Sequence, residues 1–271
     1  NANLPFHVQT SFDQSPLAPF FALIPQLSGI SIVGVATGQV EFGGNIAHRD
    51  ANGNLVYSAA GLTGSARFSQ LNLRLQDTTI NAVEPVAIRF DTREVVIESA
   101  RFAGGGSNLT VAGTKALAES GVNNLSIDGR INLSLLNVFP QIASGDTFFG
   151  GFADVSIRLA GPNSAARLSG TATLDNASFA TFVGSDRLMF ERLQGIIRFA
   201  SNQVQVDRVS GFLGGGEFVA SGGAVLGSDL RPDSFRFDLT GNNITVPLPE
   251  DFITTGDAKL EISGRRFAGG G

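Results

Sequence analysis

Residues 197–207 read IRFASNQVQVD, and this stretch decides the expected fold. Two runs in which apolar and polar residues alternate, 197–199 and 204–207, flank a polar turn. Successive side chains of a strand point to opposite faces, so each run predicts a strand with one apolar face and one polar face. Such half-buried strands are typical of antiparallel sheets.

The same alternation recurs at residues 71–75, 86–90, 155–159, 235–239 and 260–262. Helix candidates are few and short: residues 16–27, which Pro19 and Pro25 limit to one or two turns, 114–120, and 135–142, which Pro140 breaks. We therefore expect an all-β protein with very few short helices. Its elongated antiparallel sheet of repeated amphipathic strands would curl into a taco-like groove or a β-solenoid-like body.

The stretch at residue 197 has a counterpart at residues 88–90, which also read IRF. In both places a polar turn, a strand, a glycine triplet and another strand follow in the same order. The offset is 197 − 88 = 109 at the first match and 214 − 104 = 110 at the glycine triplets, which indicates one inserted residue. The triplets are expected at sharp bends or bulges of the sheet.

Further matches extend the repeat. Residues 62–66 resemble 168–172, with an offset of 168 − 62 = 106, and residues 38–43 resemble 153–161 and 256–264. We predict an entry segment at residues 1–34, with a short proline-limited helix and the first strands. A first β unit at 35–115, a second at 116–225 and the start of a third at 226–271 would follow, all in one continuous domain.

Repetition of one-sided strands would align their apolar faces into a long hydrophobic surface. Soluble proteins rarely leave so large a surface bare, so it would be closed by a second sheet, folded into a groove or occupied by a ligand. The residues expected to contact acyl chains on this surface are Ile88, Phe90, Val155, Ile157, Leu159, Ile197, Phe199, Val204, Val206, Phe235, Phe237, Leu239, Leu260 and Ile262.

Composition excludes other classes of function. The net charge of −5 argues against nucleic acid, which needs a basic surface, and the chain has no cysteine. The 22 phenylalanines without a tryptophan suit a dry or hydrocarbon-binding surface better than sugar or base recognition. The two histidines, His7 and His48, lie far apart in the sequence, and no nucleophile elbow or metal-ligand cluster accompanies them.

We therefore predict no catalytic residues, no cofactor, no metal and no enzymatic activity. The glycine triplets lack the lysine and the helix of a phosphate-binding loop, and Asn52-Gly53 predicts a hairpin turn.

The repeat resembles the TamB family of translocation and assembly module proteins, within the AsmA-like bacterial intermembrane proteins. The resemblance is carried by short strands that end in glycine, at 154–161 and 257–264, by the glycine-rich segments 102–106 and 212–216, and by the ITVPLP stretch at 244–249. It spans most of the chain from about Val35 onward.

This resemblance implies a periplasmic location in a diderm bacterium, with an inner-membrane anchor that is not in this chain. It also implies a long β-taco body with a hydrophobic interior and an outer-membrane barrel partner of the TamA type. The chain begins without Met and ends in three glycines, so we expect an internal piece of such a body.

Two functions of different class follow from these patterns. In the first, the apolar groove carries phospholipid acyl chains between the inner and outer membranes and supports outer-membrane protein assembly. In the second, the protein is an edge-strand platform or chaperone scaffold for nascent outer-membrane barrel proteins, without lipid carriage. A third interpretation, an adhesin-like β-solenoid, would normally have repeats of about 20–30 residues.

Overall fold

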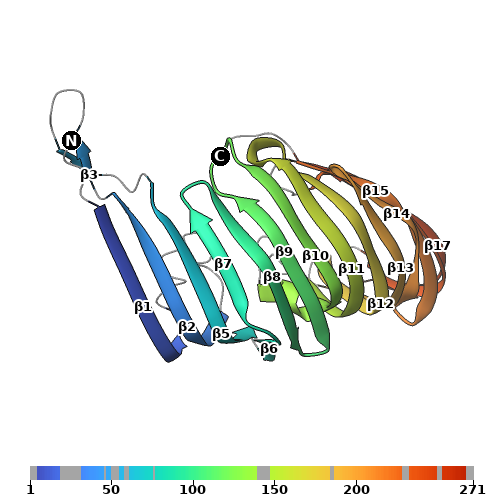
Figure 1. The fold of residues 1–271 in the computed structure, drawn as a ribbon. Helices are drawn as coiled ribbons and strands as arrows, with labels where there is room; N and C mark the ends of the chain where they lie inside the picture. The colour runs from blue at the N-terminus through green and yellow to red at the C-terminus, as the bar shows by residue number, and fades with distance from the viewer. Residues whose placement is uncertain are drawn as a thin grey trace. The chain divides into compact units, whose positions relative to one another are not determined.

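Strands make up nearly all of the computed structural model (Figure 1), which describes residues 5–18, 32–45, 47–49, 55–57, 61–75, 77–138, 147–183, 186–227, 232–248 and 252–266. The strands are β1 (Pro5–Pro16), β2 (Ile32–Asn45), β3 (Ala47–Arg49), β4 (Leu55–Tyr57), β5 (Thr63–Leu75), β6 (Thr78–Ala82), β7 (Val86–Asp91), β8 (Glu94–Gly104), β9 (Ser107–Ala116), β10 (Val122–Asn132), β11 (Phe148–Pro162), β12 (Arg167–Val183), β13 (Asp186–Ala200), β14 (Gln203–Leu213), β15 (Gly216–Leu226), β16 (Pro232–Leu248) and β17 (Phe252–Arg265). Two short 3-10 helices, η2 (Leu133–Val138) and η3 (Asn163–Ala165), interrupt them.

Fifteen of the strands form one antiparallel sheet in the order β1-β2-β5-β6-β8-β9-β10-β11-β12-β13-β14-β15-β16-β17, with β7 pairing with β5 and β8. The predicted all-β class and the scarcity of helices are confirmed. Strands β3 and β4 form a separate antiparallel pair. Their connection holds the predicted Asn52-Gly53 turn, which lies outside the described residues.

The three helix predictions have different outcomes. Residues 114–116 belong to strand β9, so the helix predicted at 114–120 is wrong. The prediction at 135–142 overlaps η2, and its remaining residues lie outside those described. Most of the segment predicted at 16–27 also lies outside the described residues.

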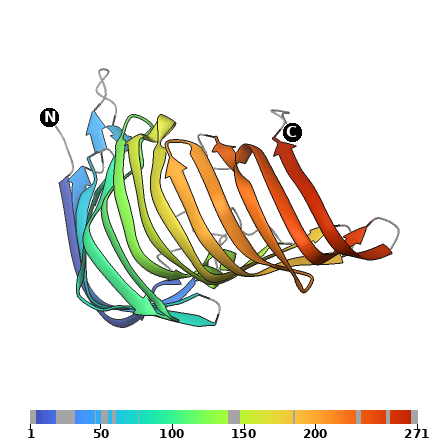
Figure 2. The same ribbon diagram turned by 90° about the vertical axis from the view of Figure 1, so that its right-hand side faces the viewer.

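The chain divides into two compact units, which are described separately below. The N-terminal unit comprises residues 1–127 and 159–166, and the C-terminal unit comprises 128–158 and 167–271. The N-terminal unit has a buried cluster of Leu17, Ala36, Leu71, Val86 and Ala100. The corresponding cluster of the C-terminal unit is Leu213, Phe218, Leu239 and Ile244. In the C-terminal unit, β13 to β17 lie side by side in chain order (Figure 2).

The internal repeat is visible in the strand pairing of each unit. Ile88 pairs with Ile97 across β7 and β8, and Ile197 pairs with Val206 across β13 and β14. The hairpin ends pair Gly104 with Ser107 in one unit and Leu213 with Gly216 in the other. The paired positions of β7 to β9 therefore correspond to those of β13 to β15 at an offset of 109, since 213 − 104 = 109, and the expected one-residue insertion is not needed there.

The glycine triplets form turns between strands. Two residues with positive φ connect each hairpin, Gly105 and Gly106 in one unit and Gly214 and Gly215 in the other. Two-residue hairpin loops of this kind favour glycine because both residues must adopt positive φ. The strand irregularities lie elsewhere, and one recurs at the offset of 109, between Ile97 and Ala100 and between Val206 and Val209.

Candidate functional site

The apolar face of the C-terminal unit is built from residues that pair directly across neighbouring strands. Directly paired residues of antiparallel strands point to the same side of the sheet. One row contains Ala172, Ile197, Val206, Gly222, Phe237 and Ile262, and the next contains Gly170, Phe199, Val204, Ala224, Phe235 and Gly264. A third contains Leu174, Gly195, Val209, Ala220, Leu239 and Leu260.

This arrangement brings together most of the predicted lipid-contacting residues. Those that share the apolar face of the C-terminal unit are Ile197, Phe199, Val204, Val206, Phe235, Phe237, Leu239, Leu260 and Ile262. On β11, Val155 and Ile157 are half-buried and alternate with exposed polar residues. The Cα of Ile157 would lie 3.0 Å from a Cβ added at Gly170, which pairs with Phe199. The other three predicted residues, Ile88, Phe90 and Leu159, belong to the N-terminal unit.

Burial on this face changes along the strands. In β16, Ile244 is 1% exposed and Leu239 is 4% exposed, whereas Phe237 and Phe235 are half-buried. In β17, Ile262 is 42% exposed although it pairs with Phe237 on the same face. The apolar face is therefore covered near Ile244 and also at Val206, which is 9% exposed in the row of Ile262, and it is accessible at Ile262 on β17, the last strand of the described sheet.

A run of phenylalanines contributes to the packing in the C-terminal unit. Phe149, Phe179, Phe190 and Phe218 stand in sequence from β11 to β15, with ring centroids 5.5, 5.9 and 5.5 Å apart. Phe218 is 4% exposed and belongs to the buried cluster. None of the four was singled out from the sequence. The abundance of phenylalanine in the sequence indicates aromatic packing in general. It does not predict which rings come into contact, because these residues lie on strands that are far apart in the chain and local alternation does not relate them.

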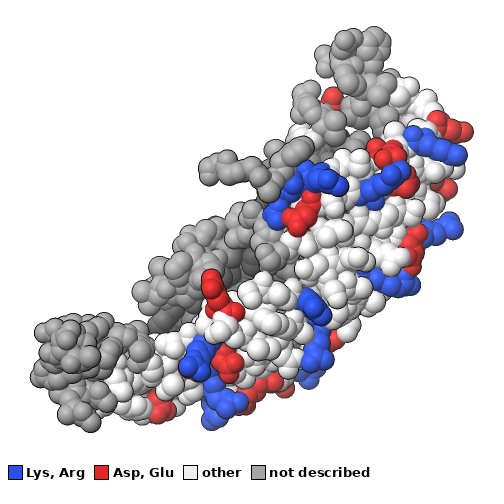
Figure 3. Space-filling model, turned by 90° about the horizontal axis from the view of Figure 1, so that it is seen from above, with Lys and Arg blue, Asp and Glu red and all other residues white. Residues whose placement is uncertain are grey.

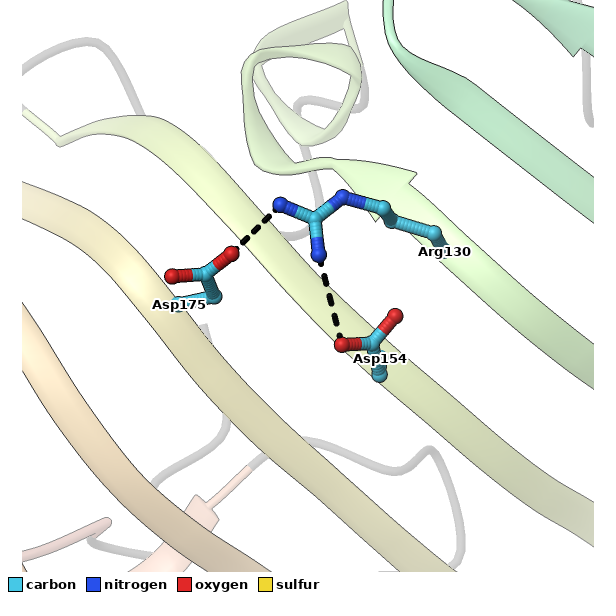
Figure 4. Close-up of polar contacts among 3 residues, drawn as sticks. All are labelled: Arg130, Asp154 and Asp175. Atoms are coloured by element: carbon cyan, nitrogen blue, oxygen red, sulfur yellow. Dashed lines mark hydrogen bonds and ion pairs between the residues drawn. The ribbon is translucent and has the colours of Figure 1, made fainter.

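The opposite face of the C-terminal unit is polar and carries ion pairs. Arg236 Nη2 lies 2.9 Å from Glu261 Oε2. On β10, Arg130 reaches across to two carboxylates, Asp154 on β11 at 3.4 Å and Asp175 on β12 at 2.5 Å (Figure 4). The hydrogen bond to Asp175 is the main cause that raises the pKa of Arg130. These contacts hold three neighbouring strands in register on the side away from the apolar face.

Charges of both signs are interspersed on the molecular surface seen in Figure 3, which shows no extended basic area among the described residues. A hollow of about 720 Å³ lies on the polar face of the C-terminal unit above Gly223. Its polar lining includes Gln205, Arg236, Ser263 and Arg265. Apolar residues line it as well, among them Ala200 and Val225, and Val225 is 45% exposed.

The N-terminal unit has an apolar face of the same construction. One row of paired residues runs through Val8, Phe42, Gly64, Phe90, Val95 and Lys115. The neighbouring row runs through Thr10, Val40, Ala66, Ile88, Ile97 and Gly113. Burial again varies along a strand, because Val86 is 1% exposed while Ile88 and Phe90 of β7 are half-buried. The predicted residues Ile88 and Phe90 thus lie on a partly accessible apolar face.

Ionisable groups do not gather into a reactive centre in the described parts of the chain. No group of three His, Cys, Asp or Glu residues there could hold a metal ion. His7 Nε2 lies 3.4 Å from Glu41 Oε1, and both side chains are more than half exposed. His48 lies in β3 and pairs with Val56. No described helix is both long and apolar enough to cross a membrane.

No family model, curated protein or solved structure matches this chain. The candidate site is therefore defined by its own geometry.

Proposed function

We propose that this protein carries phospholipid acyl chains on its apolar face, as a periplasmic segment of an inner-membrane-anchored protein that bridges to the outer membrane. The observation that carries the proposal is the alignment of Ile197, Val206, Phe237 and Ile262 in one row, which is packed at Val206 and becomes accessible at Ile262. The resemblance to the TamB family supports the same interpretation and adds a role in outer-membrane protein assembly with a TamA-type barrel partner.

The physical basis is the transfer of hydrocarbon from water. Each methylene group of an acyl chain that the face buries contributes about 0.8 kcal/mol, and such a chain needs no hydrogen bonds. Phenylalanine and branched aliphatic side chains offer that surface without a polar group to desolvate. Because adjacent strands lie about 4.8 Å apart, a row that crosses five strands is as long as an extended acyl chain of many carbons.

Site-specific photo-crosslinking tests the proposal. A benzophenone side chain placed at Phe237 should crosslink to phospholipid in bacterial membranes, whereas the same probe at Arg236 should not. Arg236 is the matched control, because it neighbours Phe237 in β16 but pairs with Ser263 on the polar face. Phe237→Asp should then reduce lipid capture by a probe at Ile262, its direct partner. Equal lipid capture at positions 236 and 237, or unchanged capture in the folded variant, would overturn the proposal.

A second candidate function is an edge-strand platform for nascent outer-membrane barrel proteins. The specific observation in its favour is that β17 pairs with β16 on one side and with no other described strand. An unpaired edge presents backbone donors and acceptors to another chain. Probes along β17 would in that case crosslink to polypeptide, and detergent extraction of lipid would leave the yield unchanged.

A further inference from the structure

Lys115 is the cationic residue of β9 in a row whose members on β1, β2, β5, β7 and β8 are uncharged, on the apolar face of the N-terminal unit. It pairs directly with Val95, which pairs with Phe90, so the three side chains lie on the same side of the sheet. The corresponding position of the C-terminal unit, at the offset of 109, is Ala224, which pairs with Val204. One of the two equivalent positions therefore holds a lysine and the other a small apolar residue.

The ammonium group of Lys115 lacks a counter-ion in the described part of the chain. Its Nζ donates hydrogen bonds of 2.8 Å to the carbonyl oxygen of Ala116 and 2.8 Å to Oδ1 of Asn163, both neutral acceptors. An ammonium has three N–H donors, so one remains for a further acceptor. Burial lowers the pKa of Lys115. The ammonium has thus lost part of its hydration, and an anion at the third donor would offset that loss.

Buried polar contacts fix the position of this ammonium. Asn123 is 1% exposed and accepts a hydrogen bond of 3.0 Å from the backbone N–H of Ala116. The amide nitrogen of Asn123 donates to the carbonyl oxygen of Gly161 at 3.3 Å and to Oδ1 of Asn163 at 3.4 Å. Asn163 thus holds both Asn123 and Lys115, and the charge is preorganised beside the apolar row.

We infer that Lys115 binds the acidic headgroup of an amphiphile, a carboxylate or a phosphate, whose acyl chain lies along Val95 and Phe90. The inference rests on the proposed function and specifies its ligand, because a neutral lipid would leave the ammonium unpaired. Hydrogen bonds to charged groups are stronger than those between neutral groups. The headgroup would therefore lie at Lys115 with the hydrocarbon directed along the row towards β1.

Calorimetric titration of the full chain with a matched set of probes tests the inference. Dodecanoate and dodecyl phosphate should bind the wild-type protein roughly tenfold more tightly than dodecanol, the effect of one charge-assisted hydrogen bond. Lys115→Met should remove this preference, so that the three amphiphiles bind the variant with similar affinities, and Lys115→Arg should keep most of it. Lys259→Met is the matched control, because Lys259 pairs with Thr240 on the polar face of the C-terminal unit.

The outcomes separate the inference from the proposed function. If all three amphiphiles bind equally and Lys115→Met changes nothing, the headgroup assignment is wrong but acyl-chain binding stands. If none of the amphiphiles binds, both are wrong. If inorganic phosphate binds as tightly as dodecyl phosphate, the site recognises a free anion and the amphiphile assignment fails. Circular dichroism of each variant, with the Arg variant as the conservative substitution, distinguishes lost binding from lost folding.

Discussion

The variation of burial along the apolar face predicts that identical truncations will have very different costs at its two ends. Ile244→Ala and Ile262→Ala remove the same atoms from neighbouring strands of the C-terminal unit, and both residues belong to the apolar face. Ile244 is 1% exposed and packs in the buried cluster, whereas Ile262 is 42% exposed. The comparison therefore isolates burial from residue type.

The magnitudes follow from the two environments. Truncating a fully buried isoleucine to alanine costs about 2–5 kcal/mol, because a cavity remains in addition to the lost transfer free energy. At Ile262, where 42% of the residue is exposed, we expect a loss of roughly 1 kcal/mol, about half of the value for full burial. Urea denaturation of the two variants and the wild type should show a midpoint shift at least twice as large for Ile244→Ala.

The same two variants should have the reverse order of effect on lipid capture. Ile262→Ala removes hydrocarbon from the accessible end and should weaken capture by a probe at Phe237, while Ile244→Ala should leave it unchanged in the folded protein. Equal destabilisation by the two truncations would show that the native face is covered along its whole length. In that case no accessible apolar surface exists in solution, and the proposed function loses its basis.

Three further predictions concern stability. Gly222→Ala should destabilise the protein by more than about 1 kcal/mol in thermal melts, because φ there is +150° and a Cβ would lie 2.2 Å from the carbonyl oxygen of Arg236. Gly256→Ala is the control and should leave the melting temperature unchanged, because a Cβ there would meet no atom within 4 Å. Hydrogen bonds from the backbone N–H groups of Arg93 and Glu94 lower the pKa of Asp91 below 3.8. The wild type should therefore be more stable than Asp91→Ala at neutral pH, and this difference in unfolding free energy should disappear as the pH falls below that value. A difference that does not change with pH would refute this assignment. The exposed pair Arg89–Glu98, at 3.3 Å, should show a coupling energy below about 1 kcal/mol in a double-mutant cycle, and this energy should fall at high salt. A larger coupling energy that does not depend on salt would contradict the exposed geometry.

The strands, and which side chains of each strand lie on its apolar side, could be predicted from local alternation. Runs such as Val86 to Phe90 and Phe235 to Leu239 form strands, because a period of two defines both the element and its apolar side. The repeat could also be predicted, although the glycine triplets suggested an inserted residue. Gly104 and Leu213 occupy the same hairpin position, so the triplets are displaced by one residue while the pairing is not.

The covered end of the face and the position of Lys115 could not be predicted. Burial at Ile244 depends on Leu213 and Phe218 of other strands, and no local pattern contains that information. The segment at 114–120 is rich in helix-forming residues, and this composition predicts a helix that contains Lys115. Pairing with Val95 overrides this preference, because the backbone of β9 pairs with that of β8 from Glu94 to Gly104 with one irregularity.

The two copies of the repeat differ in a way that bears on function. Three local features are the same in both copies. Each has a glycine with positive φ, Gly113 in the first and Gly222 in the second, with a strand irregularity beside it. Each also has an ion pair on the polar face, Arg89–Glu98 in the first and Arg198–Asp207 in the second. The backbone pairing is thus the same in both copies, while residues on the apolar face differ. The lysine found in one copy, where the other has alanine, is such a change. It alters what the face can bind while the scaffold that presents it stays constant, which is how a repetitive sheet can hold chemically distinct positions along one hydrophobic surface.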